Sequence, residues 1–213
     1  MRFITLLLAS LLAAASIGAA MAVEQPRYSV ERSEPGIELR RYPGFVVAET
    51  FVEGDFDSAG RVGFRRIAGY IFGKNASARG ETEKIAMTAP VTMEPASERI
   101  AMTAPVTMEP AEVGDAPNWR VHFVMPSSYR LADLPKPLDP LVTLREVGAH
   151  RVAAVTFSGW TTRASIAENT ARLQAWMSAQ GLVAAGRPQV ARYNDPFTLP
   201  WNRRNEILIE VAP

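Results

Sequence analysis

The chain repeats one order of expected elements, and this repetition limits what it can fold into. In each copy a strand pattern ends at a glycine, a helix pattern follows, and two more strand patterns come next. The first strands end at Gly54 and Gly159, and a Val-Ala pair precedes each glycine by the same distance, at 47–48 and 152–153. Two such units pack their sheets edge to edge or face to face and leave a groove beside their helices. The sequence therefore predicts an α+β domain in which one strand, helix, strand, strand unit occurs twice.

Strands are expected where apolar and polar residues alternate between turn residues. Pro35-Gly36 favours a tight turn and predicts a hairpin, and Pro126 ends a later strand. The expected strands cover residues 28–34, 37–42, 46–52, 119–125, 142–147, 151–157, 188–193 and 206–211.

Two helices are expected where apolar residues recur every three or four positions. We expect Asp57 or Ser58 to cap the first helix, which runs to about Phe72 and ends at Gly73. Its apolar stripe consists of Gly60, Phe64, Ile67, Ala68 and Ile71. The second helix ends at Gly181, and one of its faces carries Ile166, Thr170, Leu173 and Met177.

A twelve-residue segment, 85–96, recurs without change at 100–111. Because its residues alternate with a period of two, we expect both copies to be half-buried strands that pair as an antiparallel hairpin. Pro90 and Pro105 each remove a ladder donor, so the strands need an edge or a bulge. The apolar faces of this hairpin and the next strand carry five methionines, which either fill the core or contact a flat apolar ligand such as haem: Met87, Met93, Met102, Met108 and Met125.

The first 22 residues are typical of a signal peptide. Arg2 precedes an apolar run over residues 3–15, and the small-residue triplet 20–22 offers a cleavage site. We expect cleavage to leave a single domain over 23–213 that is periplasmic or secreted from a bacterium and has no integral membrane anchor. An uncleaved N-terminal anchor is the alternative. Because the chain has no cysteine, neither a disulfide scaffold nor a lipid-modified lipoprotein is expected.

Charge and motifs argue against two classes of function. Arg2 is the single charged residue of the leader, so its removal lowers the formal net charge from +1 to zero, which disfavours nucleic-acid binding. No nucleophile elbow, phosphate loop, dinucleotide-binding glycines or zinc-protease motif occurs. We therefore expect a protein that is not an enzyme and carries no metal site; an enzyme that uses a groove acid such as Glu94 or Glu109 ranks last.

The chain has two histidines, His122 and His150, and neither has a second ligand at metal-binding spacing. His150 lies in an expected turn, where exposure is the default. His122 lies on the strand face opposite Trp119, Val121 and Phe123. We expect a surface histidine there; an axial haem ligand or a catalytic base is the alternative.

The edge of the first helix is the candidate binding surface. Arg61 and Arg65 flank Phe64 and Ala68, so cations border an apolar surface. A planar hydrophobic ligand with carboxylate groups suits this arrangement, although a solvated helix edge has the same pattern.

A loop rich in proline and aromatic residues, 196–206, precedes the last strand. Its Arg203, Arg204 and Glu206 either form an ion-pair latch that fixes that strand or border the groove.

Taken in order, the motifs of the chain resemble those of the SOUL, or haem-binding protein, family. They span nearly the whole sequence after the leader and are Tyr28-Ser-Val, Glu38-Leu-Arg-Arg-Tyr42, Gly63-Phe64 through Tyr70-Ile-Phe-Gly73-Lys-Asn75, Lys84-Ile-Ala-Met-Thr-Ala-Pro-Val91, Phe123-Val-Met-Pro126, Phe157-Ser-Gly159 and Arg203-Arg-Asn-Glu206. The resemblance implies a distorted antiparallel β-barrel of two sheets with two helices, as in effector-binding domains of the GyrI-like type.

The resemblance also implies reversible, non-covalent binding of haem or another tetrapyrrole in a shallow hydrophobic groove along the first helix. Arg61, Phe64 and Ala68 match that segment of the family, and Arg65 is added to them from the edge of the first helix described above. No other cofactor is implied. The hairpin region in which some members are proposed to place an axial histidine contains none here. An effector-type module for another amphipathic molecule or a protein partner is the alternative function.

Overall fold

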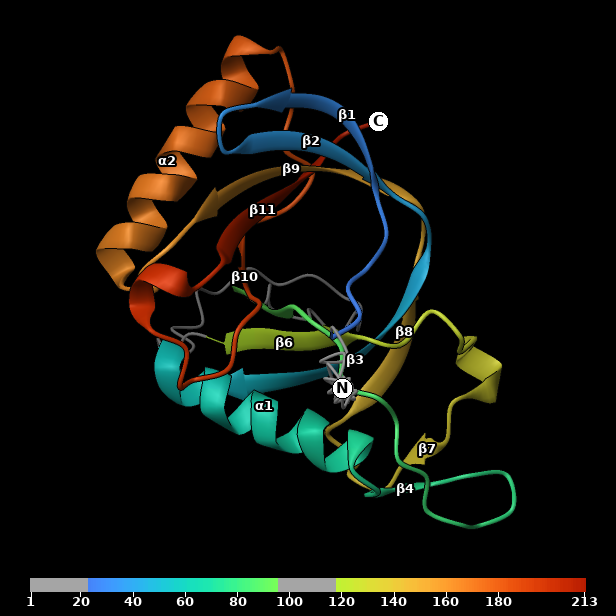
Figure 1. Cartoon of the computed structure of the whole chain (residues 1–213). Helices are drawn as coiled ribbons and strands as arrows, with labels where there is room; N and C mark the ends of the chain where they lie inside the picture. The colour runs from blue at the N-terminus through green and yellow to red at the C-terminus, as the bar shows by residue number, and fades with distance from the viewer. Residues whose placement is uncertain (1–22, 96–117) are drawn as a thin grey trace, which may run out of the picture.

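The computed structural model describes residues 23–95 and 118–213, which form one large antiparallel sheet, a two-stranded ribbon and two α-helices (Figure 1). The expected leader and the second copy of the repeat lie outside these residues. The elements are β1 (Ser29–Glu34), β2 (Ile37–Tyr42), β3 (Phe45–Glu53), α1 (Phe56–Ile71), β4 (Asn75–Ala76), β5 (Val91–Pro95), β6 (Asn118–Val124), η1 (Leu131–Asp133), β7 (Lys136–Pro137), β8 (Thr143–Val147), β9 (His150–Phe157), α2 (Arg163–Ala179), β10 (Gln189–Arg192), η2 (Pro200–Asn202) and β11 (Asn205–Val211).

The nine strands of the large sheet follow the order β1-β2-β9-β11-β10-β5-β6-β3-β8 among the described residues. The units β3-α1-β5-β6 and β9-α2-β10-β11 are therefore arranged symmetrically about the β10–β5 pair, which confirms the repeated unit. The two sheets that we expected are the halves of one sheet, because β10 pairs with β5 through Val190↔Met93, Ala191↔Thr92 and Arg192↔Val91. This sheet curls strongly, and both helices lie on its outer face (Figure 1).

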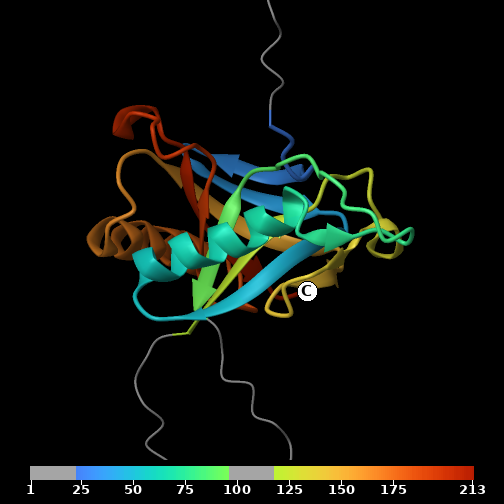
Figure 2. The same ribbon diagram turned by 90° about the horizontal axis from the view of Figure 1, so that it is seen from below.

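Two apolar clusters hold the helices against the sheet. One lies beneath α1 and includes Ile67, Val121 and Phe123, and the other lies beneath α2 and includes Leu173 and Ile207. Figure 2 shows α1 crossing the strands of its own half of the sheet. Because burial of apolar area is the main favourable term in folding, these two outer clusters account for most of the stability of the fold.

The ends of the helices follow local hydrogen bonds. Asp55 caps α1, since its Oδ1 accepts from the amides of Asp57 and Ser58 at 3.1 and 3.0 Å. The cap that we expected at Asp57 or Ser58 is therefore wrong by two or three residues. Thr162 caps α2 by accepting from the Ser165 amide at 3.1 Å. Neither these helices nor any other helix within residues 23–95 and 118–213 is long and apolar enough to cross a membrane.

The first copy of the repeat is a strand only in its second half, β5. Before it, Ile85 donates its amide to Ile71 O and Ala89 donates its amide to Glu24 O, both at 2.9 Å. The expectation of a strand over the whole copy is therefore wrong. Met93 and Met125 are buried in the cluster beneath α1, which supports the core-filling interpretation for these two methionines.

Candidate functional site

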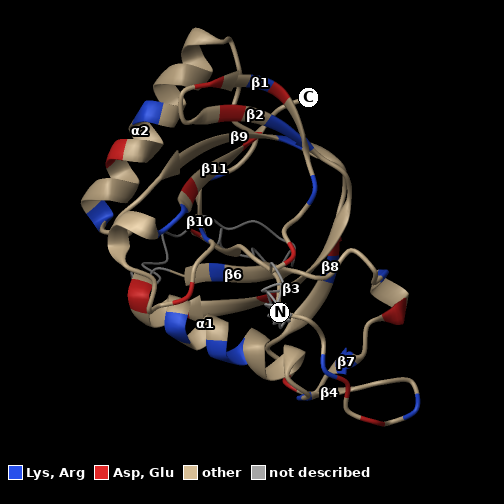
Figure 3. Cartoon of the chain, viewed as in Figure 1, with Lys and Arg blue, Asp and Glu red and all other residues tan. Residues whose placement is uncertain are grey.

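The outer face of α1 carries the four residues that the sequence singled out. Arg61 and Arg65 are exposed, and Arg61 Nη2 donates to Ser58 Oγ at 3.1 Å. Phe64 is 41% exposed, whereas Ala68 is only 8% exposed and lies at the base of this surface. Figure 3 shows basic residues following one another along α1. The structure thus brings an exposed aromatic ring and two cations together on one face of the helix.

Phe64 is supported from below by the sheet. Its ring centroid lies 5.5 Å from that of Phe123 on β6, which is fully buried. Gly63 permits this close approach, because a Cβ at that position would lie 2.6 Å from Val121 Cγ2. The exposed ring is therefore an extension of the core, and its position is fixed by the packing of α1 on β6.

A third arginine of α1, Arg66, was not among the residues expected from the sequence. Arg66 Nη1 donates to Phe51 O at 3.1 Å and to Thr50 Oγ1 at 3.4 Å. It ties the helix to β3 and is therefore engaged in structure. The sequence gave no signal that distinguishes Arg66 from Arg61 or Arg65.

Cavities of about 510 and 120 Å³ lie at one end of the curled sheet and inside it. Their linings contain none of Arg61, Phe64, Arg65 and Ala68. The groove expected beside α1 therefore stays a prediction.

His122 is not a surface residue, and that expectation is wrong. It is 8% exposed and lines the smaller cavity on the inner face of the sheet. Burial, and then the charges of Arg120 and Arg145, lower the pKa of His122 to about 3. The imidazole is therefore neutral at physiological pH. The curl of the sheet encloses the strand face that we expected to meet solvent.

His150 is half-buried in an aromatic cluster. Its ring is stacked on Tyr42 with centroids 5.6 Å apart, and Phe45 contacts it edge-on at the same distance. His150 Nδ1 lies 2.8 Å from Gly148 O. Both histidines of the chain thus face the inside of the sheet or its end, and neither lies on the α1 surface.

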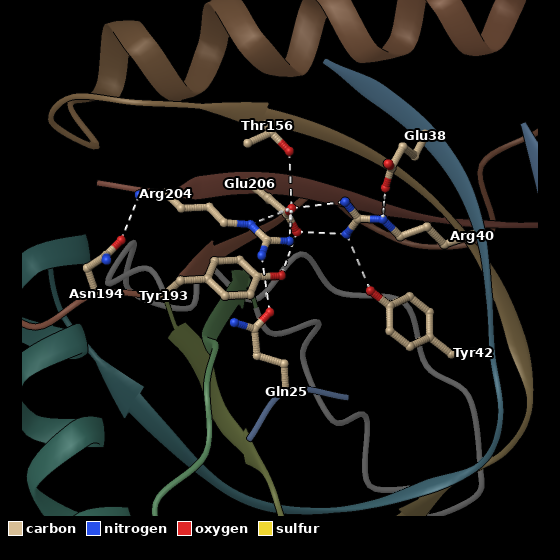
Figure 4. Close-up of polar contacts among 9 residues, drawn as sticks. All are labelled: Gln25, Glu38, Arg40, Tyr42, Thr156, Tyr193, Asn194, Arg204 and Glu206. Atoms are coloured by element: carbon tan, nitrogen blue, oxygen red, sulfur yellow. Dashed lines mark hydrogen bonds and ion pairs between the residues drawn. The ribbon is translucent and has the colours of Figure 1, made fainter. Parts of the chain in front are cut away.

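A buried ion-pair network fixes β11 inside the sheet (Figure 4). Arg40 binds both carboxylate oxygens of Glu206 at 2.8 and 3.0 Å, Arg204 Nη2 binds Glu206 Oε1 at 2.7 Å, and Tyr193 donates to Glu206 Oε2 at 2.6 Å. Although burial opposes the charge, the hydrogen bonds and charge of Arg40, followed by Tyr193 and Arg204, lower the pKa of Glu206 to about 2. The latch interpretation is confirmed for Arg204 and Glu206.

The third member of the expected latch has another role. Arg203 donates to Thr198 O and Pro196 O, each at 2.8 Å, and its guanidinium lies 4.2 Å from the centre of the Trp160 ring. It therefore shapes its own loop, from which Phe197 and Trp201 protrude with 93% and 68% exposure.

The profile of the SOUL heme-binding protein family matches residues 23–210. The chain belongs to the SOUL family. It is 31% identical over 202 residues to heme-binding protein 2 of Homo sapiens, covering 91% of this chain and 89% of that protein. It is also 25% identical over 178 residues to heme-binding protein 1 of Xenopus laevis, covering 83% of this chain and 84% of that protein. Both relatives are named as heme-binding proteins, and neither as an enzyme.

Solved structures share the fold of this SOUL protein at low identity. The EcmrR C-terminal domain has a TM-score of 0.55 at 12% identity, over 87% of this chain and 98% of that chain. A hydrolase from Listeria innocua has a TM-score of 0.54 at 14% identity, over 85% and 94%. These likenesses confirm the α+β fold with two helices and a large antiparallel sheet, of the kind found in GyrI-like effector-binding domains. At such identities they carry no activity over to this chain.

Proposed function

We propose that this SOUL protein binds haem or a related tetrapyrrole reversibly and without chemical turnover on the exposed face of α1. Family membership supports the ligand class, and the aromatic and cationic character of this face supports the location. The observation that carries the location is the half-exposed Phe64 ring, supported by Phe123 and flanked by exposed Arg61 and Arg65.

The residues of this face fit a flat dicarboxylate. Phe64 offers apolar area to the macrocycle, and Ala68, one turn further along, adds no bulk that would hold a planar ring away. Arg61 and Arg65 are four positions apart and so lie on neighbouring turns of the helix, from which guanidinium groups can each bind a carboxylate with two hydrogen bonds. We expect them to hold the two propionates.

Bound haem iron would receive no imidazole from this face, because the two histidines of the chain lie inside the sheet or at its end. The binding free energy then comes from apolar contact and from the arginine–carboxylate pairs. Hemin and metal-free protoporphyrin IX are therefore expected to bind with similar affinity.

The test is a titration of purified protein with hemin, protoporphyrin IX and protoporphyrin IX dimethyl ester, followed by absorbance and tryptophan quenching. Removing the ring in Phe64→Ala is expected to weaken binding about tenfold, equivalent to about 1.4 kcal/mol. Arg61→Ala combined with Arg65→Ala is expected to reduce the affinity for the two free acids to that for the ester. Arg163→Ala, at an exposed arginine that begins α2, is the control and should change nothing. Equal affinity of wild type for acid and ester would exclude the propionate pairing, and unchanged affinity in Phe64→Ala would exclude the site.

We also propose that the protein is exported and processed after Ala22. Intact-mass measurement of protein taken from a bacterial periplasmic fraction should give a chain that begins at Val23. A chain that keeps residues 1–22 in the membrane fraction would favour the uncleaved anchor.

A further inference from the structure

Two adjoining loops at one corner of the molecule expose large apolar side chains. One loop, residues 158–162, follows β9, and the other, residues 194–203, lies between β10 and β11 and contains η2. Four of their side chains are more than half exposed: Trp160, Phe197, Leu199 and Trp201. We call these four residues the apolar corner. Large apolar side chains that gather at one exposed place mark an interaction surface.

Hydrogen bonds join the two loops, so their apolar side chains belong to one surface. Gly159 donates its amide to Pro200 O at 2.8 Å, and Asn205 Nδ2 donates to Gly159 O at 3.1 Å. The Arg203 guanidinium, from the second loop, lies over the Trp160 ring of the first. The position of each loop therefore depends on the other.

The charged groups of the second loop hold its shape from within. Asp195 Oδ1 accepts from the amides of Phe197 and Thr198 at 2.8 and 3.0 Å. Arg203 donates to two carbonyl oxygens of the same loop, each at 2.8 Å. The loop is thus fixed while its apolar side chains stay exposed, so a partner does not have to order it on binding.

The charge and shape of the apolar corner favour a lipid surface over another protein. Asp195 is the single acid and Arg203 the single base of the two loops, so their net charge is zero. Figure 2 shows the second loop, in red, at an outer corner of the molecule. A protein partner would need a matching pocket for each protruding ring, whereas the boundary between water and lipid accepts such rings without one, and tryptophan is typical of that boundary.

The start of the described chain lies on the same side of the molecule. Arg204, which follows the second loop, donates from Nη1 to Gln25 Oε1 at 3.1 Å. Figure 2 shows the start of the chain, in blue, and the loop, in red, on the same upper side. The expected leader, residues 1–22 with their apolar run, joins the domain at Val23. A chain held in a bilayer by that leader would present this side to the lipid.

We propose that the apolar corner binds the surface of a phospholipid bilayer, with the rings of Phe197 and Trp201 inserted into the lipid. This inference goes beyond tetrapyrrole binding and rests on the proposed export only for bringing the chain to a membrane. Because apolar contact drives the binding, zwitterionic lipid is sufficient. The contact persists after the leader has been cleaved.

Vesicles of dioleoylphosphatidylcholine test the proposal with the mature chain, residues 23–213. Trp160 and Trp201 are much more exposed than the other two tryptophans, Trp119 and Trp176, so they dominate the response to lipid. Their emission should shift to shorter wavelength and be quenched by lipids brominated on the acyl chains. Adding phosphatidylglycerol should change the affinity by less than about threefold. Absence of the shift and quenching, or binding only when phosphatidylglycerol is present, would overturn the proposal.

A pair of matched variants tests the place of contact. Phe197→Ser should weaken vesicle binding about tenfold and keeps both exposed tryptophans as reporters. Leu138→Ser is the control, because Leu138 is also more than half exposed but follows β7, on the opposite side of the molecule (Figure 1). It should bind vesicles as the wild type does. Unchanged binding by Phe197→Ser, or an equal loss in both variants, would overturn the proposed place.

Two more measurements separate this surface from its alternatives. Phe197→Ser should keep the wild-type affinity for hemin, and Phe64→Ala should keep the wild-type affinity for vesicles. Failure of the hemin titration with intact vesicle binding therefore refutes only the α1 proposal, whereas loss of vesicle binding in Phe64→Ala would overturn this one. Sedimentation velocity without lipid should show a monomer. A dimer that Phe197→Ser dissociates would identify a second copy of the chain as the partner and overturn the lipid assignment.

Discussion

The contact between Gly63 and Val121 leads to a sharp prediction about stability. In Gly63→Ala the new Cβ would lie 2.6, 2.7 and 3.0 Å from the Cγ2, Cβ and Cγ1 atoms of Val121. Val121 is fully buried, so it cannot move aside without disturbing β6. Overpacking of this kind costs about 1–3 kcal/mol, and three close contacts place this site near the upper end. Alanine regains about 1 kcal/mol through helix propensity, which leaves a net loss of about 2 kcal/mol.

Urea unfolding followed by circular dichroism measures this loss of free energy. In thermal unfolding the same loss should lower Tm by about 4–8 °C. Gly69→Ala, six residues further along α1, is the matched control. There the new Cβ meets only the flexible side chain of Lys74, at 3.1 Å, so the propensity gain should dominate and the variant should be slightly more stable.

A second substitution tests the cause. Val121→Ala removes the two clashing methyl groups, so the double variant should lose less than the sum of the two single variants. Two results would show that the close packing of α1 on β6 is not the reason for a glycine at position 63. One is a Gly63→Ala protein as stable as Gly69→Ala. The other is a double variant whose loss of stability equals the sum of the losses in Gly63→Ala and Val121→Ala.

Two further predictions concern the buried network and a helix cap. Glu206→Gln should destabilise the protein by about 3 kcal/mol at pH 7, because buried Arg40 then keeps only its ion pair with Glu38 and loses the fully buried carboxylate that binds two of its nitrogens. Since the folded pKa of Glu206 is lowered to about 2, the carboxylate contributes fully above its unfolded value of about 4.5 and loses its contribution as the pH falls toward 2. Urea midpoints from pH 7 to 2.5 should therefore converge for wild type and variant, and a constant gap would contradict the assignment. Asp55→Ala should lower the free energy of unfolding by about 1 kcal/mol in the same assay. Replacing the exposed neighbour Asp57, whose side chain does not cap the helix, should lower it by less.

The sequence predicted most elements because they follow local rules. Period-two alternation located β6 and β9, and Pro35-Gly36 located the turn between β1 and β2, where Gly36 has a φ of +76°. The start of α1 was misplaced because Asp55, Asp57 and Ser58 are all good capping residues. Only the backbone geometry decides that Asp55 accepts the amide hydrogens.

Local sequence patterns could not predict which distant strands pair or how the sheet curls. The β10–β5 pair joins residues nearly a hundred positions apart, and nothing in either strand specifies the partner. His122 was misplaced for the same reason: alternation gives the face of a strand, but whether that face meets solvent depends on how the whole sheet curls. Arg61, Phe64 and Arg65 were placed correctly on one helical face because a helix is a local structure.

The order of the strands makes the two halves mutually dependent. The hairpin β1–β2 comes from the start of the chain yet pairs with β9 of the second unit, while β8 leads into that unit but pairs with β3 of the first. The hairpin that precedes the first unit thus completes the sheet of the second unit, and the strand that precedes the second unit completes the sheet of the first. Neither half carries all of its own sheet, although both halves repeat the same unit.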